Sequence, residues 1–265
     1  MIQYAYLVIE GPHDVEFVGQ FMKRWGFSRV KMMSELDEFW YPLVPREFPY
    51  ADDLLRRMPV PTFFKSATHS IALHNAIGDS NIIRTIRGTL AVTSWEANSL
   101  VGLGIVLDAD SEISPKERFD QIKEGLQQLD FIPALPELPG KVALGKPRCG
   151  IFVMPDNLSA GTLEDLLLEC AEQVYPSLLQ CTQEFIGCVE PVVTQFKKKK
   201  DRRDFEKPAG RKKVTVGCIA NVLRPGKSVQ VSIQDNQWVT EETVTLPNLA
   251  HFNKFIQELF ALSSS

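Results

Sequence analysis

Three short apolar segments, each followed by a turn and a helical pattern, most restrict how this chain can fold. Residues 4–9 form the first apolar run, and residues 103–107 and 150–154 form two others. Short apolar runs of this kind are typical of strands buried on both faces of a sheet. Strands that alternate with amphipathic helices form parallel βαβ units. The sequence therefore predicts an α/β fold, with a mostly parallel sheet and helices on both of its faces.

The order of these segments divides the 265 residues into two regions. The α/β core is predicted to span residues 1–175, with an irregular insertion at about 35–65 that is rich in proline, aromatic and charged residues. Residues 176–265 show helical segments, so we expect a C-terminal α-rich extension. A chain of this length buries roughly three quarters of the surface that its unfolded form exposes, which excludes disorder of the whole chain.

Several classes of protein are excluded by the composition. No segment approaches the roughly 18 consecutive apolar residues that span a bilayer, and the N-terminus lacks the features of a secretory signal. We therefore expect a cytoplasmic protein with no membrane partner. The five cysteines form no C-x-x-C pair, and the four histidines show no zinc spacing. Structural zinc and thiol catalysis are not expected.

Acidic residues follow the predicted strands, at the sheet edge where α/β proteins bind ligands. Glu10 ends the first strand, and Asp14 lies one helical turn later. Asp108 and Asp110 end a later strand. Residues two apart on a strand point to the same side, so these two carboxylates aim at one point if the strand continues through Asp110. The sequence thus predicts a cluster of carboxylates at this edge.

The helix after the last core strand adds two more acids. Glu164 and Asp165 open this helix, and we interpret Asp165 as a capping partner of Thr162 more than as a ligand. Like charges about 4 Å apart repel strongly unless a cation lies between them. Mg²⁺ or Mn²⁺, which prefer oxygen ligands, would relieve that repulsion. Single members also have structural explanations, since Asp14 can simply complement a helix N-terminus.

A basic strip stands out against the overall charge. Between Lys197 and Lys213, ten Lys or Arg residues face three acidic residues, so the strip carries +7 and leaves −11 for the rest of a chain of net charge −4. For the charge alone, a solvated flexible loop is the simpler explanation. Beside a carboxylate site, the strip is also suited to bind nucleic-acid phosphates. The candidate contacts are Lys197, Lys198, Lys199, Lys200, Arg202 and Arg203.

The order and separation of the acidic motifs resemble a known family. The segments VIEGPHD at residues 8–14 and VLDAD at residues 106–110 look like the Toprim domain of topoisomerases, bacterial primases and small nucleases. The resemblance covers roughly residues 3–170. Within this group, GTLEDLL at residues 161–167 resembles the third acidic motif of the overcoming-lysogenisation-defect nucleases and related Toprim-like families of unknown function. RKK at residues 211–213 resembles their late lysine, which either Lys212 or Lys213 could match.

This resemblance implies a divalent-metal-dependent nuclease that acts on DNA or RNA. Glu10, Asp108, Asp110 and Glu164 would hold Mg²⁺ or Mn²⁺. Glu10 would alternatively act as a general base supported by Asp14, and Lys212 or Lys213 would neutralise charge that develops on the phosphate.

Two other functions remain open from the sequence. The chain has no ATPase half with a phosphate-binding loop, no topoisomerase tyrosine domain and no primase zinc module, so strand passage and primer synthesis by this chain alone are not expected. One alternative is a noncatalytic or partner-dependent Toprim module that binds nucleic acid or a separate ATPase subunit. The other is phosphoryl chemistry on a small nucleotide. The sequence does not predict an oligomeric state.

Overall fold

The computed structural model describes residues 2–47, 52, 54, 60–93, 100–110, 113–129 and 134–262. Within this part of the chain, seven strands form one sheet in the order β2-β3-β4-β1-β5-β7-β6. The central strands β4, β1, β5 and β7 are parallel, whereas β3 and β2 at one edge and β6 at the other are antiparallel to their neighbours. The strands are β1 (Gln3–Ile9), β2 (Ser28–Arg29), β3 (Thr62–Lys65), β4 (His69–Asn75), β5 (Leu100–Asp108), β6 (Val142–Ala143) and β7 (Arg148–Met154).

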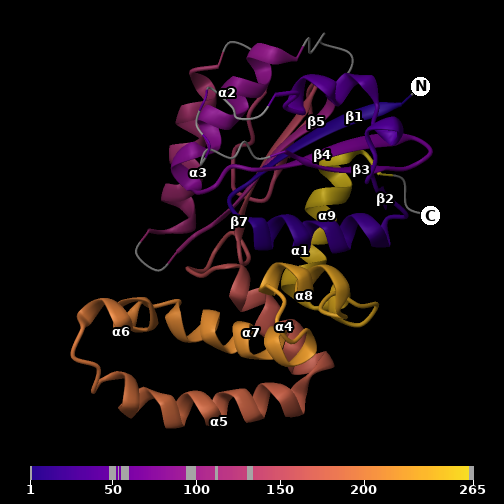
Figure 1. Ribbon diagram of the computed structural model, residues 1–265. Coiled ribbons are helices and arrows are strands. Elements are labelled where there is room, and N and C mark those ends of the chain that lie inside the picture. Colours follow the sequence, from indigo (N-terminus) through magenta and orange to yellow (C-terminus); the bar gives the residue numbers. More distant parts are fainter. Residues whose placement is uncertain are drawn as a thin grey trace.

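Helices cover both faces of the sheet, with α1 and α9 on one face and α2 and α3 on the other (Figure 1). The predicted α/β class is therefore confirmed. The α-helices are α1 (Pro12–Arg24), α2 (Ile82–Val92), α3 (Pro115–Gln127), α4 (Leu163–Val174), α5 (Pro176–Val193), α6 (Lys199–Glu206), α7 (Gly210–Leu223), α8 (Val229–Asp235) and α9 (Pro247–Phe260). Short 3₁₀ helices are η1 (Met33–Glu35), η2 (Glu38–Leu43), η4 (Asp79–Asn81) and η5 (Thr243–Thr245).

Strand β1 lies between β4 and β5 because its apolar run is buried from Ala5 to Ile9. Its last residue, Ile9, is paired with Asn75 on β4 and with Val106 on β5. The carboxyl ends of β1 and β5 therefore lie side by side. Glu10 and Asp108 occupy these two neighbouring ends, as the sequence predicts.

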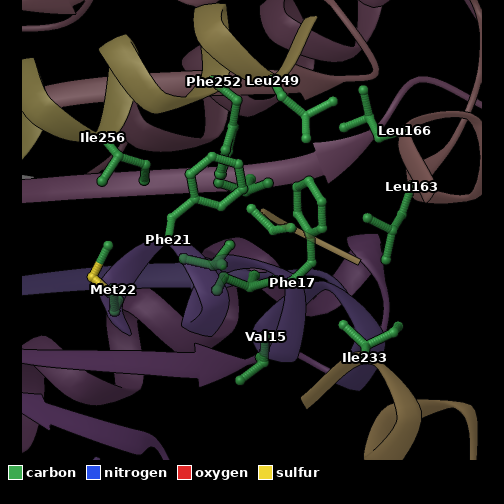
Figure 2. Close-up of a cluster of buried hydrophobic side chains, with 14 of the residues drawn as sticks. Val15, Phe17, Phe21, Met22, Leu163, Leu166, Ile233, Leu249, Phe252 and Ile256 are labelled. Atoms are coloured by element: carbon green, nitrogen blue, oxygen red, sulfur yellow. The ribbon is translucent and has the colours of Figure 1, made fainter. Parts of the chain in front are cut away.

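The first face of the sheet carries an aromatic core between α1 and α9 (Figure 2). Phe17 and Phe21 of α1 are fully buried against Phe252 of α9, and the rings of Phe21 and Phe252 lie 5.0 Å apart, edge to face. Burying an aromatic side chain of this size stabilises a fold by roughly 2–3 kcal/mol. Leu163 and Leu166 bring the start of α4 into the same cluster. The core thus holds the N-terminal turns of α1 and α4 close together.

Helix α9 packs directly on the backbone of the sheet. Gly102 of β5 permits this approach, because a Cβ at this position would lie 2.4 Å from the carbonyl oxygen of Leu259. The rings of Phe152 on β7 and Phe255 on α9 lie 5.3 Å apart beside it. The C-terminal region from residue 176 is therefore not uniform. Helix α9 packs on the sheet, α7 packs against α4 and α8, and α5 and α6 project away from the sheet (Figure 1).

The predicted irregular insertion packs into the second face of the sheet. Trp40 of η2 is fully buried, and its Nε1 donates a hydrogen bond of 3.0 Å to the Ser70 hydroxyl. The end of this range forms strand β3, which lies between β2 and β4 and which its sequence pattern does not indicate. Residues 48–51, 53 and 55–59 of the insertion lie outside the described residues. Across the described helices, none is long and apolar enough to cross a membrane.

Candidate active site

The predicted acids at the strand ends are joined by hydrogen bonds. The backbone N–H of Asp108 donates to Glu10 Oε2 at 3.1 Å, and Asp108 Oδ1 accepts from the N–H of Leu163 at 2.9 Å. The first bond links the ends of β1 and β5, and the second links β5 to the first turn of α4. An unpaired N–H at a helix N-terminus favours an anionic partner, which explains why a carboxylate lies there.

A pocket of about 320 Å³ opens over these strand ends. Glu10, Asp14, Asp108 and Glu164 line it, and they come from the ends of β1 and β5 and the first turns of α1 and α4. Asp14 and Glu164 are each only 8% exposed. The structure therefore brings together around one pocket four of the five acids predicted as ligands or catalytic residues, two of them buried and two half-buried.

Burial and mutual repulsion change the acidity of this group. Burial raises the pKa of Asp14 to about 7, with the charge of Glu10 as the next cause. Burial likewise holds the pKa of Asp108 well above its ordinary value, and the charges of Asp14, Glu10 and Glu164 raise it further. The pKa of Glu10 is raised by burial too, although the Asp108 N–H opposes this shift. A cation placed here would restore the charged forms of all three carboxyl groups.

We expect the stability of the metal-free protein to fall as the pH rises from about 4 to about 7. Asp14 has an ordinary pKa of 3.8 and a folded-state pKa of about 7, so the folded state retains a proton that the unfolded state releases over this range. The full contribution is on the order of 4 kcal/mol. Denaturant titrations in a chelator at pH 4 to 8 measure this slope. Asp14→Asn should flatten the slope, whereas Asp120→Asn at a partly exposed position of α3 should not. Equal slopes in all three proteins would contradict the assignment.

Asp110 departs from the predicted arrangement. Strand β5 ends at Asp108, and Asp110 adopts a left-handed backbone with φ of 60° and an isolated bridge to Gly161. The expectation that Asp108 and Asp110 aim at one point along a continuous strand is therefore wrong. The Asp110 carboxylate accepts a hydrogen bond of 2.5 Å from Arg118, which also donates to Asp79 at 2.6 Å. Asp110 remains close enough to raise the pKa of Glu10, but it is outside the residues that line the pocket.

The two candidate lysines point to different places. Lys212 Nζ lies 2.5 Å from Asp165 Oδ1, and Asp165 Oδ2 accepts from the N–H of Thr162 at 2.9 Å. Asp165 is thus a capping partner, as the sequence predicts, and Lys212 pairs with it. Lys213 lines the carboxylate pocket, where its charge lowers the pKa of Asp14. The sequence leaves open whether Lys212 or Lys213 belongs to the site, and the structure favours Lys213.

The basic strip forms helix α6 and the start of α7. Lys197 to Lys200 are exposed, and within the described chain they form no ion pair. Arg202 pairs with Glu206 at 3.2 Å and Arg203 with Asp204 at 3.4 Å. None of these six basic residues is among the described residues that line the pocket. These six residues carry their positive charge on the projecting arm formed by α5 and α6, whereas Lys213 at the end of the strip lines the pocket.

The donor set of the pocket suits a hard divalent cation, because it consists of carboxylate oxygens. Asp14 Oδ1 is buried and accepts no hydrogen bond from the described residues, so one oxygen is already available. However, no three His, Cys, Asp or Glu side chains of the described chain are arranged to hold a metal ion. Glu10, Asp108 and Glu164 each use one oxygen in a hydrogen bond. The carboxylate oxygens are therefore suitable ligands for a divalent cation, but the side chains must reorient to bind it together.

His13 is a site residue that the sequence reasoning did not select. It lines the pocket between Glu10 and Asp14, and burial lowers its pKa while the charge of Glu164 opposes this shift. The sequence contains one indication of this position, because His13 lies inside the motif at residues 8–14. The turn that begins α1 places consecutive residues of this motif at the strand ends. A neutral imidazole at this position can donate or accept a hydrogen bond.

Comparisons with known proteins match this chain over nearly its whole length. The family described as "Protein of unknown function (DUF3226)" matches residues 4–261. No curated protein is significantly similar to the chain in sequence. Among solved structures, a hypothetical protein from Pyrococcus horikoshii has a similar fold, with a TM-score of 0.56 and 16% sequence identity over 97% of this chain and 95% of that one. At this identity the likeness concerns the fold alone, and it includes the C-terminal helices.

Proposed function

The chain belongs to the DUF3226 family of proteins of unknown function, and we propose that it is a divalent-metal-dependent nuclease that cleaves phosphodiester bonds of DNA or RNA. The observation that carries this proposal is the convergence of Glu10, Asp14, Asp108 and Glu164 on one pocket beside Lys213. Four acids and one lysine at the carboxyl edge of a parallel sheet are suited to bind cations and the phosphate that such cations attract. The Toprim-like motifs at residues 8–14 and 106–110 support the same function.

Each residue has a role that its position supports. Asp108, Glu10 and Glu164 would hold Mg²⁺ or Mn²⁺, and Asp14 lies against Glu10. Bound ions of this kind activate a water molecule and stabilise the leaving oxygen of a phosphodiester. Lys213 would place a positive charge at the phosphate, where it opposes the negative charge that develops in the transition state. Asp110, held by Arg118, lies beside this group and would act on Glu10 through its charge.

Cleavage of defined substrates tests this function. We expect the purified protein to nick supercoiled plasmid or cut labelled RNA in Mg²⁺ or Mn²⁺, and to lose this activity in a chelator. Activity toward mononucleotides that does not depend on polymer length would instead support a small-nucleotide enzyme. No cleavage of any polymer by highly purified protein would overturn the proposed nuclease.

A partner-dependent module is the second candidate, and the projecting arm favours it. Helix α5 and the segment after it expose large apolar side chains, with Phe185 53%, Val192 49% and Phe196 42% exposed. Exposed apolar side chains that gather on one element often mark a contact with another protein. In this reading the arm would bind a separate subunit, such as an ATPase, and Asp108→Asn would leave that binding intact.

We expect the basic strip to control binding of nucleic acid rather than chemistry. Replacing Lys197, Lys198, Lys199 and Lys200 by glutamine should weaken binding about equally for all sequences, because phosphate contacts carry no sequence information. If all four lysines contact phosphates, the slope of log affinity against log salt should decrease by roughly 3 to 4. Fluorescence anisotropy over a salt series measures both effects.

A matched variant separates this effect from a general loss of charge. Four other exposed lysines, which form no ion pair within the described residues, provide the control when replaced by glutamine: Lys31, Lys141, Lys146 and Lys227. The control should keep the wild-type salt slope. If the strip variant binds as the wild type does, the strip is a solvated surface without a ligand.

A further inference from the structure

A second and larger cavity lies next to the carboxylate pocket. It measures about 1290 Å³ and lies between η2, with the residues that follow it, and helix α2. Its walls include Tyr41, Leu43 and Val92 as well as Arg84 and Gly88. The volume exceeds the roughly 300–1,000 Å³ of sites for small ligands. This groove therefore has room for more than a single nucleotide.

The groove and the carboxylate pocket meet at Ile77, which lines both. The neighbours of Ile77 are tied to the strand end that carries Glu10. The N–H of Ala76 donates to the Ile9 carbonyl at 2.8 Å, and the N–H of Gly78 donates to the Glu10 carbonyl at 2.9 Å. A ligand in the groove would thus reach the acids directly past Ile77.

Ile77 is held in a conformation that a β-branched residue rarely adopts. Its φ is 57°, and its side chain is 58% exposed. The Asn75 side chain accepts a hydrogen bond of 2.8 Å from its N–H, and the Asn81 amide donates one of 2.8 Å to its carbonyl oxygen. Backbone strain of this kind occurs preferentially at functional sites. Strain and exposure together mark an apolar side chain held at the border of the two cavities.

The charge on one wall of the groove is suited to phosphates. Helix α2 carries Arg84 and Arg87 and no acidic residue. Arg84 and Arg46 line the groove and form no ion pair with any described residue. The opposite wall, formed by η2 and residues 44–47, carries Arg46 together with Glu38 and Glu47. The positive charge that no acid on the same wall offsets is therefore that of Arg84, so an anionic backbone would follow α2 and leave the bases to the apolar walls.

We propose that the groove binds an unpaired strand of nucleic acid, with its bases in the groove and Ile77 packed against the base next to the scissile phosphate. The class of ligand rests on the proposed nuclease function. Unpaired bases expose apolar faces that stack on side chains, whereas bases in a duplex are paired and stacked on one another. Apolar side chains such as isoleucine are also known to insert between bases. The proposal therefore assigns single-stranded segments as the preferred substrate.

Two variants test the groove without disturbing the fold. Gly88→Trp places a bulky side chain in the groove, at an exposed helical position where an added Cβ meets no atom within 4 Å. Ile77→Gly removes the apolar side chain and suits the positive φ, so its thermal stability should equal or exceed that of the wild type. Gly187→Trp is the matched control, because Gly187 is an exposed glycine of α5 that also has open space at its Cβ.

Binding is measured by anisotropy with a labelled 20-mer single strand and the corresponding duplex in a chelator, which keeps the strands intact. Cleavage is measured in Mn²⁺. We expect Gly88→Trp and Ile77→Gly to weaken single-strand binding about tenfold or more, as the loss of one stacked base would. Gly187→Trp should bind as the wild type does, and duplex binding should be weaker and insensitive to all three changes.

The outcomes separate this inference from the function on which it rests. Wild-type single-strand binding by Gly88→Trp, or equal binding of duplex and single strand, would overturn the groove assignment even if the protein is a nuclease. Binding of a mononucleotide as tightly as the 20-mer would also overturn it. Loss of single-strand binding in Gly88→Trp without any cleavage by the wild type would support the groove and overturn the nuclease.

Discussion

Asp108→Asn should abolish metal-dependent cleavage, weaken Mn²⁺ binding and stabilise the metal-free protein. Asp108 is half-buried and lines the pocket with Asp14, Glu10 and Glu164, so removing its charge relieves repulsion when no cation is present. The asparagine carbonyl can still accept the hydrogen bond from the Leu163 N–H, which preserves the link to α4. Metal ligands contribute several kcal/mol to such reactions, so we expect a decrease in rate of about a thousandfold or more. Plasmid nicking, calorimetric titration with Mn²⁺ and thermal unfolding in a chelator measure the three effects.

The three effects must occur together for this interpretation to hold. Asp120→Asn on α3 is the matched control, because Asp120 is a partly exposed aspartate that pairs with Lys116 at 2.5 Å outside the pocket. It should leave all three measurements unchanged. Equal Mn²⁺ affinity in wild type and Asp108→Asn would remove Asp108 from the set of ligands. Cleavage that persists in Asp108→Asn would indicate a contaminating nuclease and favour the partner-dependent module.

Lys213→Ala should lower the rate of cleavage about a hundredfold or more, whereas Lys212→Ala should change it little. Lys213 faces the acids of the pocket, and removing one stabilising group at a developing charge typically costs a factor of 10²–10³. Lys212 is instead bound to Asp165, which caps α4, so its loss acts on the helix terminus. Single-turnover cleavage separates the chemical step from binding.

A second measurement distinguishes the two lysines without any catalysis. Lys213 lowers the pKa of Asp14, so Lys213→Ala should raise that pKa further, whereas Lys212→Ala should not. Titration of the carboxyl groups by NMR in a chelator reports this difference. Loss of activity in Lys212→Ala together with full activity in Lys213→Ala would reverse the assignment.

The positions of the acids at the strand ends are the part of the site that the sequence predicts best, because they depend on strand direction alone. An apolar run that ends in an acid places that acid at the carboxyl end of a parallel strand, and this was enough to locate Glu10 and Asp108. The Thr162 motif predicted the capping role of Asp165 in the same way, because the hydrogen bond is local. Local patterns and the rules of parallel sheets therefore predict the frame of the site.

The remaining details depend on conformations and contacts that no local pattern contains. Asp110 leaves the strand through a left-handed turn, and its partner Arg118 lies on α3. Lys212 and Lys213 are adjacent on one helix, so only the packing of α7 decides which of them faces the pocket. Strands as short as β2 and β6, with two residues each, carry no periodicity. Tertiary packing determines these features.

The position of α9 also has a consequence for the synthesis of this protein on the ribosome. The sheet is complete in sequence at Met154, yet the helix that covers its backbone at Gly102 ends at Phe260. At 5–20 residues per second, roughly 5 to 20 s separate the translation of these two points. During that interval the apolar face that includes Phe152 has no α9 to cover it, and transiently exposed apolar surface of this kind makes a nascent chain prone to aggregation.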